Sequence, residues 1–312
     1  MTALGHLPVL PAQVLDVLAP RPGDTMLDCT VGRAGHALLI APLLAPAGRY
    51  IGLDVDPANL AYARQRLAEA PCQIDLIHAN FATAPSVLAG LGVARVDLLL
   101  ADLGFSSTQM DDPSRGLSFT TDAPLDMRLD PTLPTSAADL VNALPQLELA
   151  NLIYRYGEER LSRRIARNIV EERRQSPILT TARLAQLVRR AYGPAGYRQR
   201  IDPATRTFMA LRIAVNAELE ALTSLLEQLP GLLAPGGRAA IISFHSLEDR
   251  LVKHAFAELA QQDVAQRLTR KPVTADEQEI AGNPRSRSAK MRAIRMVDNP
   301  APPRPTGDAT PD

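Results

Sequence analysis

The chain is poor in the residues that crosslink a protein or anchor it in a lipid bilayer. It contains no tryptophan and only two cysteines, Cys29 and Cys72, which cannot form a disulfide framework. No Cys-x-x-Cys pair is present, so we expect no metal site. The best candidate for a membrane span, residues 37–47, is broken by two prolines, and no signal peptide is visible at the N-terminus. These absences predict a cytoplasmic protein with no membrane partner.

Lysine is also scarce, with three copies among 34 basic residues, and the arginines are unevenly placed. Residues 1–150 carry 8 arginines and 16 acids, whereas residues 151–212 carry 14 arginines and 5 acids. A neutral protein with one arginine-dense segment is typical of a polyanion-binding element, because a guanidinium group binds two phosphate oxygens at once. The alternative is a solvated helix face with ion pairs such as Glu159–Arg163.

Tyrosines accompany these arginines. Four of the six tyrosines in the chain lie in the arginine-rich segment: Tyr154, Tyr156, Tyr192 and Tyr197. Interleaved aromatic and basic side chains can stack on nucleobases, although core packing is the commoner use of tyrosine. The segment therefore favours nucleic acid as the polyanion.

The first hundred residues alternate between strand and helix patterns. Strands are expected at 25–29, 49–54, 74–78 and 96–102, with helices at 34–44 and 57–70. The alternation then stops at a long loop, 103–135, which is followed by helical segments at 147–174, 182–192 and 203–229. A further strand is expected at 238–243, a helix at about 247–261, and a last strand at 291–297.

This layout predicts an α/β protein in which a mostly helical domain is inserted between the fourth and fifth strands of a doubly wound parallel sheet. The first part of the sheet domain is expected at residues 1–112 and the insert at 113–207. The second part is expected at 208–298, and a proline-rich tail, 299–312, is expected to be disordered. Ligands of such sheets bind at the carboxyl ends of the strands, so polar residues at those ends are the candidate site.

The first strand runs into a glycine-containing turn, Asp28 to His36, and the second strand ends at Asp54. Glycine lets the backbone approach a ligand and turn into a helix, while an acid at the second strand can accept both ribose hydroxyls. The spacing of Gly32 and Gly35 is not the dinucleotide fingerprint G-x-G-x-x-G, which favours S-adenosylmethionine over a nicotinamide cofactor. The alternatives are a plain turn and, for Asp54, a cap for the following helix.

The third and fourth strands end in further candidates. Phe81 follows the third strand and is expected either to pack against an adenine ring or to belong to the core. Asp102 ends the fourth strand and is followed by Ser106 and Ser107. An acid and two hydroxyls at this place are suited to bind a cofactor or to accept protons from a substrate amine. The alternative for Asp102 is a turn-forming role.

The fifth strand is followed by Phe244 and His245, which are expected to lie beside the residues that follow the fourth strand. Either side chain could hold a nucleobase. Ser246 and Asp249 have the spacing of a capping box, which is the structural alternative at this place. Arg285 lies in a basic segment, 283–292, that is interpreted as a phosphate-binding or solvated loop.

Several longer motifs resemble those of one known family. They are Asp102-Leu103-Gly104-x-Ser106-Ser107, Asp111-Asp112-x-x-Arg115-Gly116, Pro124-Leu125-Asp126-Met127-Arg128, Tyr156-Gly157-Glu158-Glu159-Arg160, Pro203-Ala204-Thr205-Arg206-Thr207-Phe208, Ser243-Phe244-His245-Ser246-Leu247-Glu248-Asp249-Arg250 and Asn283-Pro284-Arg285. From His6 to about Val297 the chain resembles the bacterial 16S ribosomal RNA (cytosine-N4)-methyltransferases, the MraW-type family.

The resemblance implies a class I methyltransferase fold with an inserted helical domain, S-adenosyl-L-methionine as methyl donor, and 16S ribosomal RNA as partner. The acceptor that it implies is the N4 amine of a decoding-region cytosine, in the small ribosomal subunit. The family's cofactor contacts map onto Ala34, Gly35, His36, Asp54, Phe81, Asp102 and Gln109.

Roles in catalysis and in RNA binding are hypotheses from position along the chain. Asp102, Ser106 and Ser107 are expected on the acceptor side, Phe244 and His245 around the base, and Asp126 in ordering the loop. The side chains expected to grip RNA phosphates are Arg160, Arg163, Arg164, Arg167, Arg206 and Arg285.

The chain departs from the family where Cys29, Arg33 and Ala34 replace three glycines of the first turn, and Thr108 replaces a proline. A left-handed conformation at Arg33 or Ala34 would cost roughly 1 kcal/mol. Two rival functions remain. A nicotinamide-dependent oxidoreductase is disfavoured by the missing third glycine, and the altered turn leaves open a ribosome-assembly factor that binds RNA without catalysis.

Overall fold

The predicted sheet is present as seven strands in the computed structural model, which describes residues 7–193 and 201–298. Their order is β3-β2-β1-β4-β5-β7-β6. The strands are β1 (Thr25–Asp28), β2 (Arg49–Asp54), β3 (Gln73–His78), β4 (Val96–Asp102), β5 (Leu233–Ser243), β6 (Ala265–Arg267) and β7 (Lys290–Met296). Strands β1 to β5 pair in parallel, and β7 is antiparallel to both of its neighbours. This topology confirms the class I methyltransferase fold.

The chain divides into two compact units. Unit 1 comprises Met1–Gly104 and Ala221–Asp312, and unit 2 comprises Phe105–Glu220. The insert expected from the sequence, 113–207, is shorter than unit 2 at both ends. The predicted tail, 299–312, and Tyr197 lie outside the described residues. Among the described helices, none combines the length and apolar character needed to cross a membrane.

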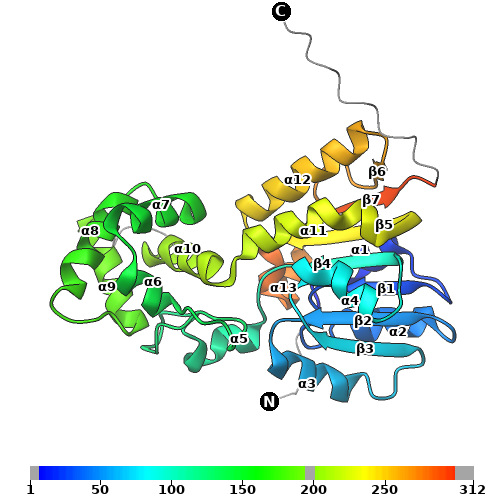
Figure 1. Cartoon of the computed structure of the whole chain (residues 1–312), viewed down its shortest axis with the longest axis horizontal. Helices are drawn as coiled ribbons and strands as arrows, with labels where there is room; N and C mark the ends of the chain where they lie inside the picture. Colours follow the sequence, from blue (N-terminus) through cyan, green and yellow to red (C-terminus); the bar gives the residue numbers. More distant parts are fainter. Residues whose placement is uncertain (1–6, 194–200, 299–312) are drawn as a thin grey trace, which may run out of the picture. The chain divides into compact units, whose positions relative to one another are not determined.

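Helices cover both faces of the sheet in unit 1 (Figure 1). One core packs α1 (Pro11–Leu18), α2 (Ala37–Leu44) and α3 (Pro57–Arg66) on side chains such as Met26 and Leu100. The other packs α4 (Ala84–Gly90), α11 (Glu218–Leu232) and α12 (Ser246–Gln261) on Leu27 and Leu99. Successive strand residues point to opposite faces, so a strand buried on both sides is apolar at consecutive positions, as β4 is from Leu98 to Ala101.

Unit 2 is mostly helical. Its helices are α5 (Ser107–Asp111), α6 (Ala137–Ala143), α7 (Gln146–Gly157), α8 (Ser162–Arg173), α9 (Thr181–Tyr192) and α10 (Ala204–Asn216). Two segments that the sequence predicts as single long helices are each divided. The breaks are Glu158 (φ 48°) and Ala217 (φ 47°), left-handed residues that cap the preceding helices.

The crossing of α7 and α10 explains why unit 2 extends past residue 207. A Cβ atom on Gly157 would lie 2.7 Å from the carbonyl oxygen of Arg206, so only glycine permits this approach. Phe208 and Leu211 are buried on the same helix, α10. The residues after 207 therefore pack with the insert, whereas the sequence assigned them to the sheet domain.

Candidate functional site

The carboxyl ends of β1, β2 and β4 adjoin in unit 1. Asp28 of β1 is in register with Gly52 of β2 and with Leu100 of β4. The hydroxyl of Thr30, just past β1, accepts the backbone N–H of Asp102 at 2.7 Å. Strand order reverses between β1 and β4, which is where ligands of such sheets bind.

The turn after β1 is tightly held. Asp28 accepts the N–H of Thr30 at 2.9 Å and the hydroxyl hydrogen of Tyr50. Burial raises the pKa of Asp28, against the effect of these hydrogen bonds. Gly32 (φ 51°) and Ala34 (φ 63°) are left-handed, while Arg33 between them is not. The conformational cost anticipated from the sequence therefore falls on Ala34, which is fully buried.

Asp54, at the end of β2, joins this turn to the start of α3. It accepts the N–H of Gly32 at 2.8 Å and that of Asp56 at 2.7 Å, and the Asn59 amide lies 3.4 Å from both carboxylate oxygens. Burial raises its pKa to about 6. The cap of α3 is Asp56, which accepts the N–H of Ala58, so Asp54 is not the helix cap that the sequence left open.

His36 and Asp102 are brought together from the first turn and the end of β4. Nε2 of His36 lies 3.7 Å from Oδ2 of Asp102, which is too long for a hydrogen bond. His36 is 7% exposed, and its Nε2 and Oδ1 of Asp102 are buried without hydrogen-bond partners. Buried polar atoms are nearly always paired, so these two indicate a place for polar groups of a ligand.

Two aromatic candidates occupy different environments. Phe81 begins the short 3₁₀ helix η1 (Phe81–Thr83) after β3 and packs, partly buried, against the core beneath α4 and α11. Phe244 follows β5, and a Cβ atom built on Gly104 would lie 3.6 Å from its ring. The N–H of Leu103 donates to Ile242 at 3.0 Å, so Phe244 lies beside the end of β4 as predicted.

His245 is the N-cap of α12. Its Nδ1 faces the N–H of Glu248 at 3.4 Å, and Glu248 accepts the N–H of Phe244 at 2.8 Å. The capping box that the sequence left as an alternative at Ser246 and Asp249 is formed one residue earlier, by His245 and Glu248. Asp249 instead binds Arg292 at 2.7 Å, because a guanidinium on β7 faces this side of α12.

The candidates after β4 lie in unit 2. Ser106 is the N-cap of α5, and Gln109 completes a capping box by accepting the Ser106 N–H at 2.8 Å. Thr108 stands where the family has proline, and its hydroxyl lies 3.0 Å from that of Ser106. Ser107 begins α5. Both Ser106 and Gln109 are buried, so the structure gives them a helix-capping role whatever else they bind.

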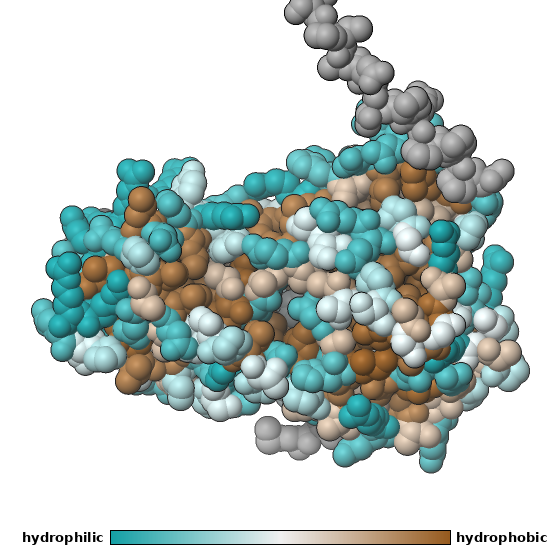
Figure 2. Space-filling view, viewed as in Figure 1, coloured by the Kyte–Doolittle hydropathy of each residue, from teal (hydrophilic) through white to brown (hydrophobic). Residues whose placement is uncertain are grey.

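The predicted RNA-binding arginines of α8 share one face. Arg163, Arg164 and Arg167 are exposed on that helix and Arg160 just before it, while Ile165, Ala166 and Ile169 are buried. Hydrophilic side chains crowd the surface over α8 in Figure 2. Among the described residues, no acidic side chain pairs with Arg160, Arg163 or Arg164, whereas Arg167 lies 3.8 Å from Glu171.

The ion pair Glu159–Arg163 that the sequence left as an alternative is absent. Glu159 is 1% exposed and accepts the hydroxyl of Tyr192 at 2.5 Å and the N–H of Leu161 at 2.7 Å. Burial and this carboxylate raise the pKa of Tyr192. Glu159 therefore binds groups within unit 2, and it does not neutralise the exposed Arg163.

The tyrosines divide by their contacts. Tyr192 binds Glu159, and Tyr156 donates to Glu220 at 2.6 Å. Tyr154 on α7 is 62% exposed, which leaves its ring open to stacking. Arg285, the sixth predicted phosphate ligand, lies in the short helix η4 (Pro284–Ser288) of unit 1, separate from the arginines of unit 2.

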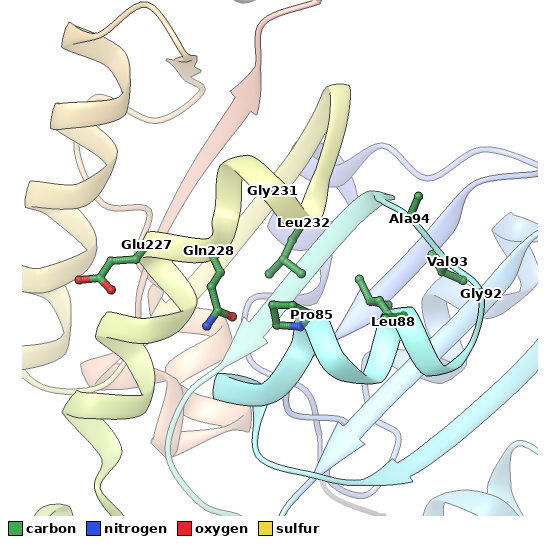
Figure 3. Close-up of a pocket in the computed structure, with 10 residues that line it drawn as sticks. Pro85, Leu88, Gly92, Val93, Ala94, Glu227, Gln228, Gly231 and Leu232 are labelled. Atoms are coloured by element: carbon green, nitrogen blue, oxygen red, sulfur yellow. The ribbon is translucent and has the colours of Figure 1, made fainter. Parts of the chain in front are cut away.

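A cavity of about 550 Å³ lies between α4 and α11 (Figure 3). Leu88, Val93 and Leu232 contribute apolar walls and Gln228 a polar one. Val93 and Ala94 precede β4, so the cavity adjoins the amino end of that strand. None of the predicted site residues lines it, and it is distinct from the carboxyl edge.

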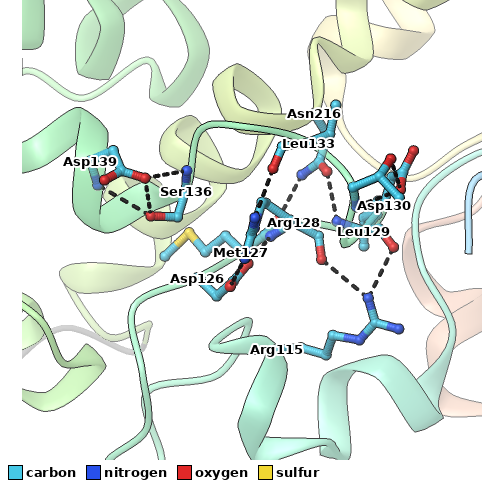
Figure 4. Close-up of polar contacts among 11 residues, drawn as sticks. Arg115, Asp126, Met127, Arg128, Leu129, Asp130, Leu133, Ser136, Asp139 and Asn216 are labelled. Atoms are coloured by element: carbon cyan, nitrogen blue, oxygen red, sulfur yellow. Dashed lines mark hydrogen bonds and ion pairs between the residues drawn. The ribbon is translucent and has the colours of Figure 1, made fainter.

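The long loop after β4 is ordered by Asp126 (Figure 4). Arg128 donates to both oxygens of Asp126, at 2.9 and 2.7 Å, while Arg115 donates to the carbonyl of Leu129 at 3.0 Å. Burial would raise the pKa of Asp126, but the hydrogen bonds from Arg128 outweigh it and hold the pKa low. Asn216 of α10 donates to the Met127 carbonyl at 2.8 Å, which anchors the loop within unit 2.

Sequence reasoning missed three residues that shape the carboxyl edge of the sheet: Thr30, Tyr50 and Asn59. Thr30 lies within the first turn, so its position was the available signal. Tyr50 is a fully buried aromatic residue inside β2, and nothing in the pattern indicates that its hydroxyl binds Asp28. Asn59 lies five residues after Asp54, on the first turn of α3.

The sequence matches one known family over nearly its whole length. The profile described as "MraW methylase family" matches residues 3–297. The ribosomal RNA small subunit methyltransferase H of Sorangium cellulosum is 51% identical over 292 residues, covering 94% of this chain and 91% of that protein. The protein of the same name from Geobacter sulfurreducens is 50% identical over 307 residues, covering 94% and 99%.

Solved structures are similar at a lower level. A putative rRNA-methylase from Clostridium thermocellum has 11% identity and a TM-score of 0.46, covering 94% of this chain and 98% of that chain. A putative methyltransferase from Streptococcus mutans, in complex with SAH, has 11% identity and a TM-score of 0.43, covering 93% and 100%.

Proposed function

Because the chain belongs to the MraW methylase family, we propose that it methylates small-subunit ribosomal RNA with S-adenosyl-L-methionine as donor. The acceptor in this proposal is the N4 amine of a decoding-region cytosine in 16S RNA, on the strength of the motifs shared with the cytosine-N4 methyltransferases. The relatives at about half identity, named as methyltransferases of the small-subunit RNA, support the substrate class.

The observation that carries the cofactor site is the pair of unsatisfied buried atoms, Nε2 of His36 and Oδ1 of Asp102. His36 belongs to the first turn, and the buried carboxylate of Asp54 accepts the N–H of Gly32 in the same turn. This arrangement suits the polar groups of an adenosine cofactor. Ala34 and Gly35 complete the turn in this proposal, with Phe81 of the same unit as a further contact. When bound, the cofactor supplies a methyl group on a positively charged sulfur.

The residues at the end of β4 would prepare the acceptor amine. The lone pair of this amine is delocalised into the cytosine ring, so a group that accepts its N–H hydrogen makes the nitrogen more nucleophilic. Asp102 has a free buried oxygen for this purpose. Its carboxylate can take up the proton that leaves once the nitrogen–carbon bond has formed. Phe244, beside the end of β4, would hold the ring, with His245 next to it in the chain.

Catalysis is tested with Asp102→Asn and Ser106→Ala in a methyl-transfer assay on small ribosomal subunits. We expect both to lose transfer. Ser106→Ala should keep S-adenosylmethionine binding close to that of the parent, whereas Asp102→Asn should weaken it, because Asp102 also belongs to the proposed cofactor site. Ser136→Ala is the matched control for Ser106, since it removes a similar capping box, from α6. Unchanged turnover in both variants would remove these residues from the mechanism.

RNA binding is assigned to the exposed arginine face of α8, with Arg206 on α10. The double variant Arg163→Gln/Arg164→Gln should reduce the salt slope of RNA binding by about 1.5, since each phosphate contact contributes roughly 0.7 to 0.9. The control Arg183→Gln/Arg190→Gln loses the same charge from α9. Those arginines pair with Glu172 and Glu171, so we expect an unchanged slope.

A calorimetric titration separates this enzyme from a non-catalytic assembly factor. The parent protein should bind S-adenosylmethionine, and Asp54→Ala should abolish binding because it removes the carboxylate next to the first turn. A parent that binds RNA but not the cofactor would support the assembly factor. Binding of a reduced nicotinamide, detected by its absorbance, would support an oxidoreductase.

A further inference from the structure

Two side chains of α3, Tyr62 and Arg66, contact Arg33, the residue between the two left-handed positions of the first turn. The guanidinium of Arg33 lies 3.6 Å from the centre of the Tyr62 ring, within the range of a cation–π contact. Arg66 donates to the backbone carbonyl of Arg33 at 3.1 Å, and its guanidinium lies 5.9 Å from the same ring. We call Arg33, Tyr62 and Arg66 the clasp.

The clasp acts where the chain lacks glycine. Arg33 and Ala34 stand between Gly32 and Gly35 in this turn, and Ala34 is left-handed although it carries a side chain. A left-handed alanine tends to return to the right-handed region, which would move the N–H groups of the turn away from a ligand. Arg33 directly precedes Ala34. Contacts that hold both the side chain and the carbonyl of Arg33 therefore oppose the return of Ala34 to the right-handed region.

The clasp is not part of the hydrophobic core. Tyr62 is half-buried and belongs to neither core cluster, whereas Asn59, Leu60 and Ala63 form the buried face of α3. Loss of the tyrosine ring should therefore disturb the turn without unfolding unit 1. This separates a positioning role from a merely structural one.

We propose that the clasp holds the glycine-poor turn in its binding conformation and thereby sets the affinity of this chain for S-adenosylmethionine. The proposal rests on the proposed cofactor site, and it makes Arg33, Tyr62 and Arg66 positioning residues. Preorganisation of a binding loop raises affinity by lowering the cost of ordering it when the ligand binds.

The test compares Tyr62→Ala with Tyr62→Phe, which keeps the aromatic face. We expect Tyr62→Ala to weaken S-adenosylmethionine binding about three- to tenfold by calorimetry, and Tyr62→Phe to restore parental affinity. In the methyl-transfer assay the KM for the cofactor should rise with kcat at saturation nearly unchanged. The matched control is Arg64→Ala on the same helix, because Arg64 donates to the Leu76 carbonyl and not to the turn.

Amide hydrogen exchange provides a second measurement that needs no cofactor. The Ala34 N–H donates to the Val31 carbonyl at 2.9 Å, and Tyr62→Ala should make it exchange faster while Arg64→Ala does not. Equal affinity and equal exchange in Tyr62→Ala and the parent would overturn the clasp. A parent that fails to bind S-adenosylmethionine would instead overturn the proposed function, and with it the role of the clasp in affinity.

Discussion

Lowering the pH from 7 to 5 should weaken S-adenosylmethionine binding about tenfold through protonation of Asp54. Burial raises the pKa of this carboxyl to about 6 in the absence of the cofactor. The ionised fraction then falls from about nine tenths at pH 7 to about one tenth at pH 5, and apparent affinity falls with it. A carboxylate accepts hydroxyl hydrogens better than a carboxylic acid does, so the ionised form is the binding form.

Calorimetric titrations at pH 5, 6 and 7 measure this effect. Asp54→Asn should bind weakly and with little dependence on pH, because amide nitrogen does not titrate. His36 also lies at this edge of the sheet, so His36→Gln is measured in parallel. A tenfold loss that persists in Asp54→Asn but disappears in His36→Gln would refute the assignment to Asp54.

The same pKa shift predicts an effect on stability with a defined sign. The folded pKa of Asp54 lies above its ordinary value of 3.8, so its contribution to stability is fully present below pH 3.8. That contribution is lost as the pH rises through about 6. The free energy of unfolding should fall by up to about 3 kcal/mol, since each unit of difference between the folded pKa and the ordinary pKa is worth about 1.36 kcal/mol. Denaturant titrations of the cofactor-free protein should show a weaker decline between pH 4 and 7 in Asp54→Asn than in the parent. Equal declines would contradict the buried carboxylate as the cause. Asp28, whose pKa is also raised, contributes in the same direction in both proteins.

Three further predictions concern stability and are checked by urea denaturation. Ala34→Gly should leave stability nearly unchanged, because relief of about 1 kcal/mol at a positive φ offsets the loss of a buried methyl group worth about 0.8 kcal/mol. The control is Ala37→Gly, which is equally buried but lies on a right-handed helix and should cost about 1.5 kcal/mol. Equal costs would contradict the strain at Ala34. Gly157→Ala should destabilise unit 2 by about 1–3 kcal/mol, since its Cβ would meet a carbonyl oxygen of α10. Gly231→Ala is the control and should not destabilise the protein, because its Cβ would meet no atom within 4 Å. Tyr192→Phe should cost about 2 kcal/mol by removing a hydrogen bond to a buried carboxylate, and an unchanged midpoint would show that water replaces the hydroxyl.

The strands and their carboxyl ends were predictable because their signals are local. The run of apolar residues in β4, the strand that ends at Asp54, and the glycine after β1 are each visible in a few neighbouring letters. The predicted sheet order brings the carboxyl ends of β4 and β5 together. The structure confirms this pairing and places Phe244 beside Gly104. Helix ends were harder, since Glu158 and Ala217 break helices with residues that carry no breaking signal of their own.

The sequence by itself determined the α/β class, the interruption after the fourth strand, the family, and the concentration of arginine in one segment. Only the tertiary structure decided how those residues are used. It buried Glu159 against Tyr192 and left Arg163 exposed, assigned the cap of α12 to His245, and left Nε2 of His36 and Oδ1 of Asp102 without partners. Hydrophobic periodicity records which faces of strands and helices are buried, but the partner of a polar atom depends on contacts between segments far apart in the chain.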